Sequence, residues 1–202
     1  MKQTLGQFVN WMPLHMLWEH DLNTFQHSLR VADLFYEFGK YKDFPLHMLN
    51  DLYEIGVLHD IGKISVPKSI LAKRGKLTPE ELTFIYSHTT YGEMILKKEN
   101  YPKIFLDSVK YHHENIDGSG YHHIKGDDIP YIARMLRIVD SFDAMTNDRV
   151  YQKSKSISMA LLDLEEKKGT WYEPDLVNEF VQMYIDKYSV DVDLITTDFH
   201  NN

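Results

Sequence analysis

Residues 23–40 read NTFQHSLRVADLFYEFGK, and this stretch sets the expected fold class of the chain. Its apolar residues recur at helical spacing and share one side of a helix: Phe25, Leu29, Ala32, Phe35 and Tyr36. A helix with one apolar side packs that side against other elements. The stretch therefore predicts one helix of a packed helical assembly.

The same spacing recurs along most of the chain, without a convincing run of strand alternation. Further helices are expected over residues 45–60, 78–100, 102–113, 130–147, 156–167 and 174–188. The helix over 78–100 begins at Thr78, because Thr78-Pro79-Glu80-Glu81 combines an N-cap, a proline at the first helical position and early acids. The expected fold is all-α, a helical bundle with one long loop at about residues 114–128.

Length and composition bound the organisation and the function. With 202 residues, one domain is expected over 23–188, with a helical extension at 1–22 and a peripheral tail at 189–202. The chain has no cysteine, which excludes disulfides, thiolate metal sites and a cysteine nucleophile. A formal net charge of −8 argues against binding to a nucleic acid polymer. No signal peptide or bilayer-length apolar run is seen, so we expect a cytoplasmic chain without a membrane partner.

Two histidine-containing pairs point to metal chemistry. His112-His113 precedes Glu114 and a glycine-rich loop, and His59-Asp60 lies ahead of Gly62 and Lys63. Imidazole and carboxylate groups are ligands of divalent first-row metals, and two such pairs are too many for one ion. The sequence therefore predicts a polynuclear metal site.

Three more residues fit the same site. His27 and His88 each lie within a predicted helix, and Asp140 interrupts the apolar face around Ile138. Each has an ordinary explanation by itself: a hydrogen-bonded core histidine, or a paired buried carboxylate. Together with the two pairs they give five histidines and two aspartates on five helices. Convergent ligands on facing helices are how helical bundles build dinuclear sites.

In this order the residues resemble the HD-GYP subgroup of the HD phosphohydrolase superfamily. The matching segments, from His27 to Tyr151, are HSLRVADLF, LHDIGKISVP, SHTTYGEMIL, YHHENIDGSGY and IVDSFDAMTNDRVY. The resemblance implies an HD-type bundle whose long loop lies beside a dinuclear metal site. Simpler HD hydrolases resemble only the parts around His27, His59-Asp60 and Asp140 and usually hold one metal.

The resemblance also implies roles for individual residues. One metal ion would be bound by His27, His59 and Asp140, and the other by His88, His112 and His113, with Asp60 bridging them. Lys63 is the candidate for stabilising developing charge or assisting proton transfer to the leaving oxygen. Substrate contacts are implied for Arg149 and for loop residues Asp117, Gly118, Gly120 and Tyr121. Glu114 and Asp143 resemble groups that orient the ligands.

Bland interpretations stay open for several of these residues. Arg149 could lie on a solvated face, the loop glycines could be turn residues, and Tyr121 could simply be packed. Glu114 and Asp143 could be ordinary helix-terminal or surface acids. The ligand set, by contrast, is complete.

Three positions depart from the family pattern. Asn23 stands where some members carry a glutamate that resembles a third-metal ligand, which favours two metals here. His122 replaces the proline of the Gly-Tyr-Pro triplet, and this change is expected to loosen the loop. Gln152 stands where a basic residue is common, which removes one phosphate contact.

The resemblance implies a phosphodiesterase with two divalent ions, iron or manganese given the donor set. It would hydrolyse cyclic di-GMP to pGpG through a metal-bridging hydroxide, and whether it also cleaves pGpG to GMP stays open. The alternatives are an HD-type phosphohydrolase for another cyclic dinucleotide or nucleotide, and a non-catalytic nucleotide-binding signalling module. A homodimer or a signalling-protein partner also stays open.

Overall fold

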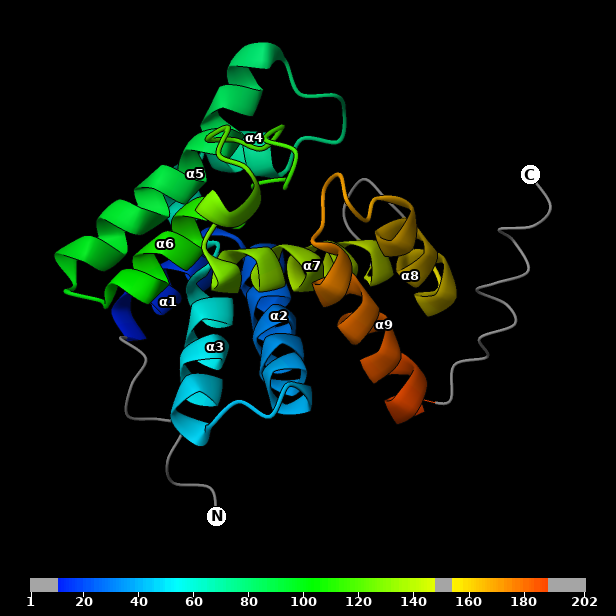
Figure 1. The fold of residues 1–202 in the computed structure, drawn as a ribbon. Coiled ribbons are helices and arrows are strands. Elements are labelled where there is room, and N and C mark those ends of the chain that lie inside the picture. The colour runs from blue at the N-terminus through cyan, green and yellow to red at the C-terminus, as the bar shows by residue number, and fades with distance from the viewer. Residues whose placement is uncertain (1–10, 148–153, 189–202) are drawn as a thin grey trace. The chain divides into compact units, whose positions relative to one another are not determined.

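The computed structural model describes residues 11–147 and 154–188, and this part of the chain contains helices and no β-strand (Figure 1). The expected all-α fold is confirmed. The chain divides into two compact units, residues 1–113 and residues 114–202.

The described part of the first unit consists of α-helices and one short 3-10 helix, η1. In chain order these are α1 (Trp11–His20), α2 (Leu22–Tyr41), α3 (Leu46–Leu58), η1 (Ile61–Ser65), α4 (Lys68–Leu71), α5 (Pro79–Lys98) and α6 (Lys103–Tyr111). Of these, α1 lies within the extension expected at residues 1–22.

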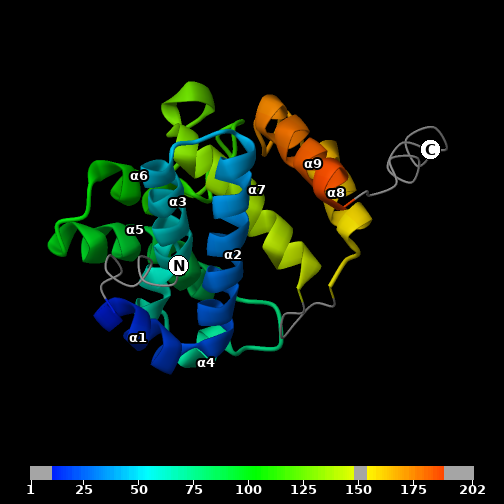
Figure 2. The same cartoon turned by 90° about the horizontal axis from the view of Figure 1, so that it is seen from below.

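Helices α2 and α3 lie side by side in both views (Figures 1 and 2). Fully buried side chains such as Phe35 on α2 and Ile55 on α3 belong to the core of this unit. Gly56 lets the two backbones approach closely, because a Cβ at this position would lie 2.6 Å from the Ala32 Cα. The close packing holds His27 of α2 near the end of α3, where His59 follows.

A second close contact joins η1 to α5. A Cβ on Gly62 would lie only 1.8 Å from the carbonyl oxygen of His88 and 2.5 Å from the nitrogen of Gly92. Helix α5 also packs against α6, where a Cβ on Gly92 would lie 2.7 Å from Val109. These glycines bring the segment after α3 directly against the α5 backbone.

Local signals set where the helices begin and end. The predicted start at Thr78 is confirmed: the Thr78 hydroxyl accepts from the Glu81 N–H, and the Glu81 carboxylate accepts from the Thr78 N–H, forming a capping box. The helix predicted over residues 45–60 ends earlier, at Leu58, so His59 and Asp60 lie in the turn before η1.

The second unit contains the long loop followed by helices. Its elements are the 3-10 helix η2 (Gly126–Asp128), α7 (Tyr131–Thr146), α8 (Ile157–Glu166) and α9 (Pro174–Tyr188). Aromatic rings of Phe142, Phe180 and Tyr184 pack together, with centroids 4.6–5.3 Å apart. The loop is tied to the segment after α8, since the Asp117 N–H donates to the Thr170 carbonyl at 3.0 Å.

Among the described residues, the helices are too short or too polar to span a bilayer. The predicted tail at 189–202 lies outside the described residues.

Candidate metal centre

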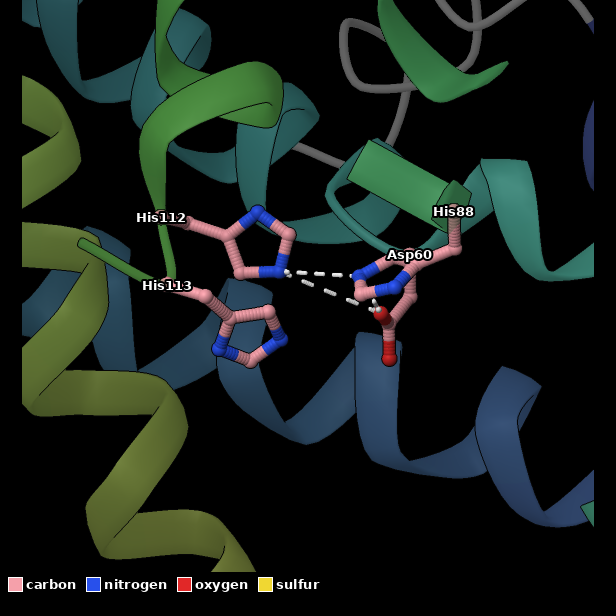
Figure 3. A group of neighbouring side chains, drawn as sticks. All are labelled: Asp60, His88, His112 and His113. Carbon is pink, nitrogen blue, oxygen red and sulfur yellow. Dashed lines mark hydrogen bonds and ion pairs between the residues drawn. The ribbon is translucent and has the colours of Figure 1, made fainter. Parts of the chain in front are cut away.

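Six of the predicted metal ligands lie together in the first unit, around the carboxylate of Asp60. They form two groups in which the potential ligand atoms lie within 4.8 Å of one another: Asp60 with His88, His112 and His113, and Asp60 with His27 and His59. Figure 3 shows the first group, with His112 and His113 across from His88 and Asp60. The two groups share one residue, Asp60.

The two oxygens of Asp60 face different histidines. Oδ2 lies 3.4 Å from His59 Nε2 and 3.8 Å from His27 Nε2. Oδ1 lies 3.2 Å from His88 Nε2 and 4.0 Å from His112 Nε2. Each oxygen can thus serve one group, which is the arrangement that a bridging carboxylate requires.

Backbone carbonyls orient three of the imidazoles. Nδ1 of His59 lies 2.7 Å from the Gly56 oxygen, Nδ1 of His88 lies 2.5 Å from the Ile85 oxygen, and Nδ1 of His112 lies 2.7 Å from the Val109 oxygen. A carbonyl oxygen only accepts, so Nδ1 must carry the proton in each ring. In the neutral imidazole Nε2 then presents its lone pair toward Asp60, as a metal ligand must.

The donor set fits a divalent ion. Nε2 of His88 and Nε2 of His112 lie 3.4 Å apart, so two lone pairs and a carboxylate oxygen converge. Atoms that bind one ion at about 2.1 Å lie roughly 3.0–3.4 Å from each other. Within the described part of the chain, the buried Oδ1 of Asp60 accepts no hydrogen bond. A cation between these atoms would satisfy all of them.

Lys63 sets the charge of Asp60. Burial by itself raises the pKa of this carboxyl, but the Lys63 ammonium beside it lowers the pKa, and the balance lies well below the usual range. Lys63 Nζ donates to Asp60 Oδ2 at 2.6 Å. Asp60 is therefore an anion at neutral pH.

The remaining predicted ligand and its neighbour lie on α7, in the second unit. Asp140 and Asp143 are both buried. Oδ1 of Asp143 accepts from Asn147 Nδ2 at 2.9 Å, near the end of the helix. The ligand role of Asp140 stays a prediction. Arg149 and Gln152 lie outside the described residues.

The predicted substrate-binding residues of the loop lie on successive turns of the second unit. Asp117 Oδ1 accepts the Ser119 N–H at 2.9 Å, and Gly118 adopts a positive φ of 84°. Gly120 is buried and Tyr121 half-buried. Glu114, expected to orient the ligands, is buried and accepts hydrogen bonds from the loop backbone at His122 and Ile124.

Sequence reasoning missed Arg137 and the structural role of Gly62. Arg137 donates to Asn115 Oδ1 at 3.1 Å and so holds the start of the loop; a cation within the apolar run Leu136-Ile138-Val139 was the available signal. Gly62 was seen in the His-Asp motif, but its contact with α5 joins segments distant in sequence, which no local pattern reveals.

Comparisons with known proteins agree with this picture. The family model described as HD domain matches residues 13–176. A cyclic di-GMP phosphodiesterase of Thermotoga maritima is 36% identical over 174 residues, covering 84% of this chain and 47% of that protein. A 3'3'-cGAMP-specific phosphodiesterase 2 of Vibrio cholerae is 39% identical over 123 residues, covering 59% of this chain and 24% of that protein. The chain thus spans less than half of the length of these relatives.

A solved structure shares the fold. Bd1817 of Bdellovibrio bacteriovorus, described as an HDG"Y"P protein, superposes with a TM-score of 0.65 at 16% sequence identity. The match covers 79% of this chain and 51% of that one.

Proposed function

Because this chain belongs to the HD-domain family, we propose that it is a metal-dependent phosphodiesterase that hydrolyses cyclic di-GMP to pGpG or GMP. The observation that carries the proposal is the Asp60 carboxylate, whose two oxygens face different groups of histidines. The Thermotoga maritima relative supports the choice of substrate.

Two divalent ions would be held by the residues gathered around Asp60. His27 and His59 would bind one ion with Asp60, and Asp140 would join them as the resemblance implies. His88, His112 and His113 would bind the other with the second oxygen of Asp60. A shell of imidazole and carboxylate without thiolate favours iron or manganese. When bound, such ions supply an activated water and neutralise charge on a phosphodiester.

Several groups of the chain would hold the ligands and Asp60 in the protonation states that metal binding requires. The backbone carbonyls of Gly56, Ile85 and Val109 keep the proton of each imidazole on Nδ1, so that Nε2 stays a ligand. Lys63 keeps Asp60 anionic, and its ammonium is the proposed group for stabilising charge or delivering a proton to the leaving oxygen. Loop residues 117–121 and Arg149 are the proposed substrate contacts.

The test is turnover of cyclic di-GMP by anaerobically purified protein supplied with Mn²⁺ or Fe²⁺, with products resolved by chromatography. We expect pGpG or GMP from the wild type and none from Asp60→Ala, whose metal content should fall while its helicity is kept. Asp175→Ala, at an exposed position of α9, is the matched control. Equal turnover in Asp60→Ala and the wild type would refute the bridging role.

A second candidate substrate is 3'3'-cGAMP, because a relative that is 39% identical carries that specificity in its name. A panel of cyclic dinucleotides at equal concentration ranks the substrates by kcat/KM. A value for 3'3'-cGAMP at least tenfold above that for cyclic di-GMP would move the proposal to this substrate. A cytoplasmic location of the chain, and a homodimer or a signalling-protein partner, stay predictions.

A further inference from the structure

We infer that Glu114 is a positioning residue, which sets the substrate-binding loop through hydrogen bonds from the backbone N–H groups of residues 122 and 124. The inference rests on the proposed function, in which loop residues contact the substrate. Glu114 is 2% exposed. Its Oε1 accepts from the His122 nitrogen at 2.7 Å and its Oε2 from the Ile124 nitrogen at 3.0 Å. One buried side chain therefore engages the segment just after Tyr121 at two points.

The held segment contains an unfavourable backbone conformation. His123, between the two donors, has a φ of 59°, in the left-handed region that non-glycine residues rarely adopt. Hydrogen bonds to a carboxylate are stronger than those between neutral groups. The two bonds that flank His123 offset the cost of its conformation, so the path of the loop after Tyr121 depends on Glu114.

A separate set of contacts holds the earlier part of the loop. Arg137 donates to Asn115 Oδ1 at 3.3 and 3.1 Å, and Asn115 Nδ2 donates to the Ser119 hydroxyl at 2.8 Å. The Arg137 guanidinium lies 5.7 and 5.5 Å from the ring centroids of Trp171 and Tyr172. Loss of the Glu114 contacts should therefore release residues 121–124 while residues 115–119 keep their position.

Residue 122 can donate to Glu114 only because it is not a proline. The family motif has proline here, and proline has no N–H to donate. In this chain the N–H of His122 makes the shorter of the two bonds to Glu114. The loop that the loss of proline was expected to loosen is thus restrained by a hydrogen bond. The role belongs to the backbone of residue 122, whatever its imidazole contacts.

Three variants of the full chain separate these contributions. His122→Pro removes one donor and His122→Ala keeps it, so the pair differs in the N–H while both lack the imidazole. Glu114→Gln leaves a single oxygen to accept. Hydrogen exchange of the Ile124 amide reports the restraint directly and requires no turnover. KM and kcat for cyclic di-GMP and the bound metal content complete the measurements.

We expect His122→Pro and Glu114→Gln to speed Ile124 exchange by roughly tenfold, the loss of about one charge-assisted hydrogen bond. In His122→Ala we expect the Ile124 amide hydrogen to exchange at the wild-type rate. KM should rise about tenfold in His122→Pro relative to His122→Ala, with kcat within about threefold and metal content equal.

Three results would overturn the inference. Equal Ile124 exchange in all three variants and the wild type would show that Glu114 does not restrain this segment. Equal defects in His122→Ala and His122→Pro would assign the role to the imidazole of His122. A joint fall of kcat and metal content would show general disruption instead of positioning. If the wild type cleaves no cyclic dinucleotide, the proposed function fails, while the exchange data still decide the role of Glu114.

Discussion

Replacement of Gly62 by alanine should damage the candidate metal centre although it alters none of the ligand side chains. The new Cβ would lie 1.8 Å from the His88 carbonyl oxygen, and real Cβ contacts are essentially never shorter than 3.0 Å, so η1 must move away from α5 by about 1.2 Å. The obstacle is backbone, which cannot rotate aside as a side chain can. A shift of this size would take Asp60 Oδ1 from 3.2 Å to beyond 4 Å from His88 Nε2.

Overpacking of this kind costs about 3 kcal/mol, which lowers the melting temperature of a chain of this size by roughly 6–12 °C. The matched control is Gly75→Ala, because a Cβ at Gly75 meets nothing within 4 Å. Calorimetry measures the melting temperature, and elemental analysis measures the bound metal. We expect Gly62→Ala to lose stability and metal and Gly75→Ala to keep both. A Gly62→Ala protein with control-like stability and full metal content would refute the reasoning.

Two further predictions concern single side chains. His88→Ala removes an Nε2 that lies 3.2 Å from Asp60 Oδ1, so elemental analysis should show about half of the wild-type metal. The control His15→Ala, at an exposed position of α1, should keep all of it. Full metal content in both variants would contradict the assignment of His88 as a metal ligand. Asp163→Asn should destabilise the chain by about 1 kcal/mol at pH 7. Burial raises the pKa of Asp163, but hydrogen bonds from Lys155 and Lys167 outweigh it and lower the pKa below 3.8. The stabilisation is therefore present above pH 3.8 and is lost as the pH falls through the lower pKa of Asp163 in the folded protein. Denaturation curves of the variant and the wild type should converge in acid. A difference in stability that does not change with pH would exclude the ionisation of Asp163 as its cause.

Helical periodicity was enough to predict the fold class and most of the helices. The apolar side of residues 23–40 predicted α2, and the Thr78-Pro79 signal predicted the start of α5, because both depend on residues within one or two turns. The turn at His59-Asp60 was predicted as helix, since its departure from the helix is set by packing of η1 against α5. Such packing joins residues far apart in sequence and leaves no local periodicity.

The candidate site shows the same division. The ligand types and their order were readable, and six of the seven predicted ligands lie together in the first unit. Which histidines lie near each oxygen of Asp60 could not be predicted from the sequence, because this depends on the directions of the side chains. The family resemblance implied that Glu114 orients the ligands, and this role stays a prediction; the hydrogen bonds of its carboxylate run to residues 122 and 124. The position of Glu114 in the sequence does not determine the direction of its carboxylate.

If two ions bind as proposed, the sharing of Asp60 between two groups of histidines would make metal occupancy a linked equilibrium. The first ion to bind would draw on the charge of a carboxylate that the second ion also needs, and the effect of one on the affinity for the other would be the same in either order. Partial metal loading would therefore yield a distribution of empty, singly and doubly occupied chains that two independent binding constants do not describe. Activity measured against added metal would then follow the doubly occupied fraction and rise more steeply than the total metal bound.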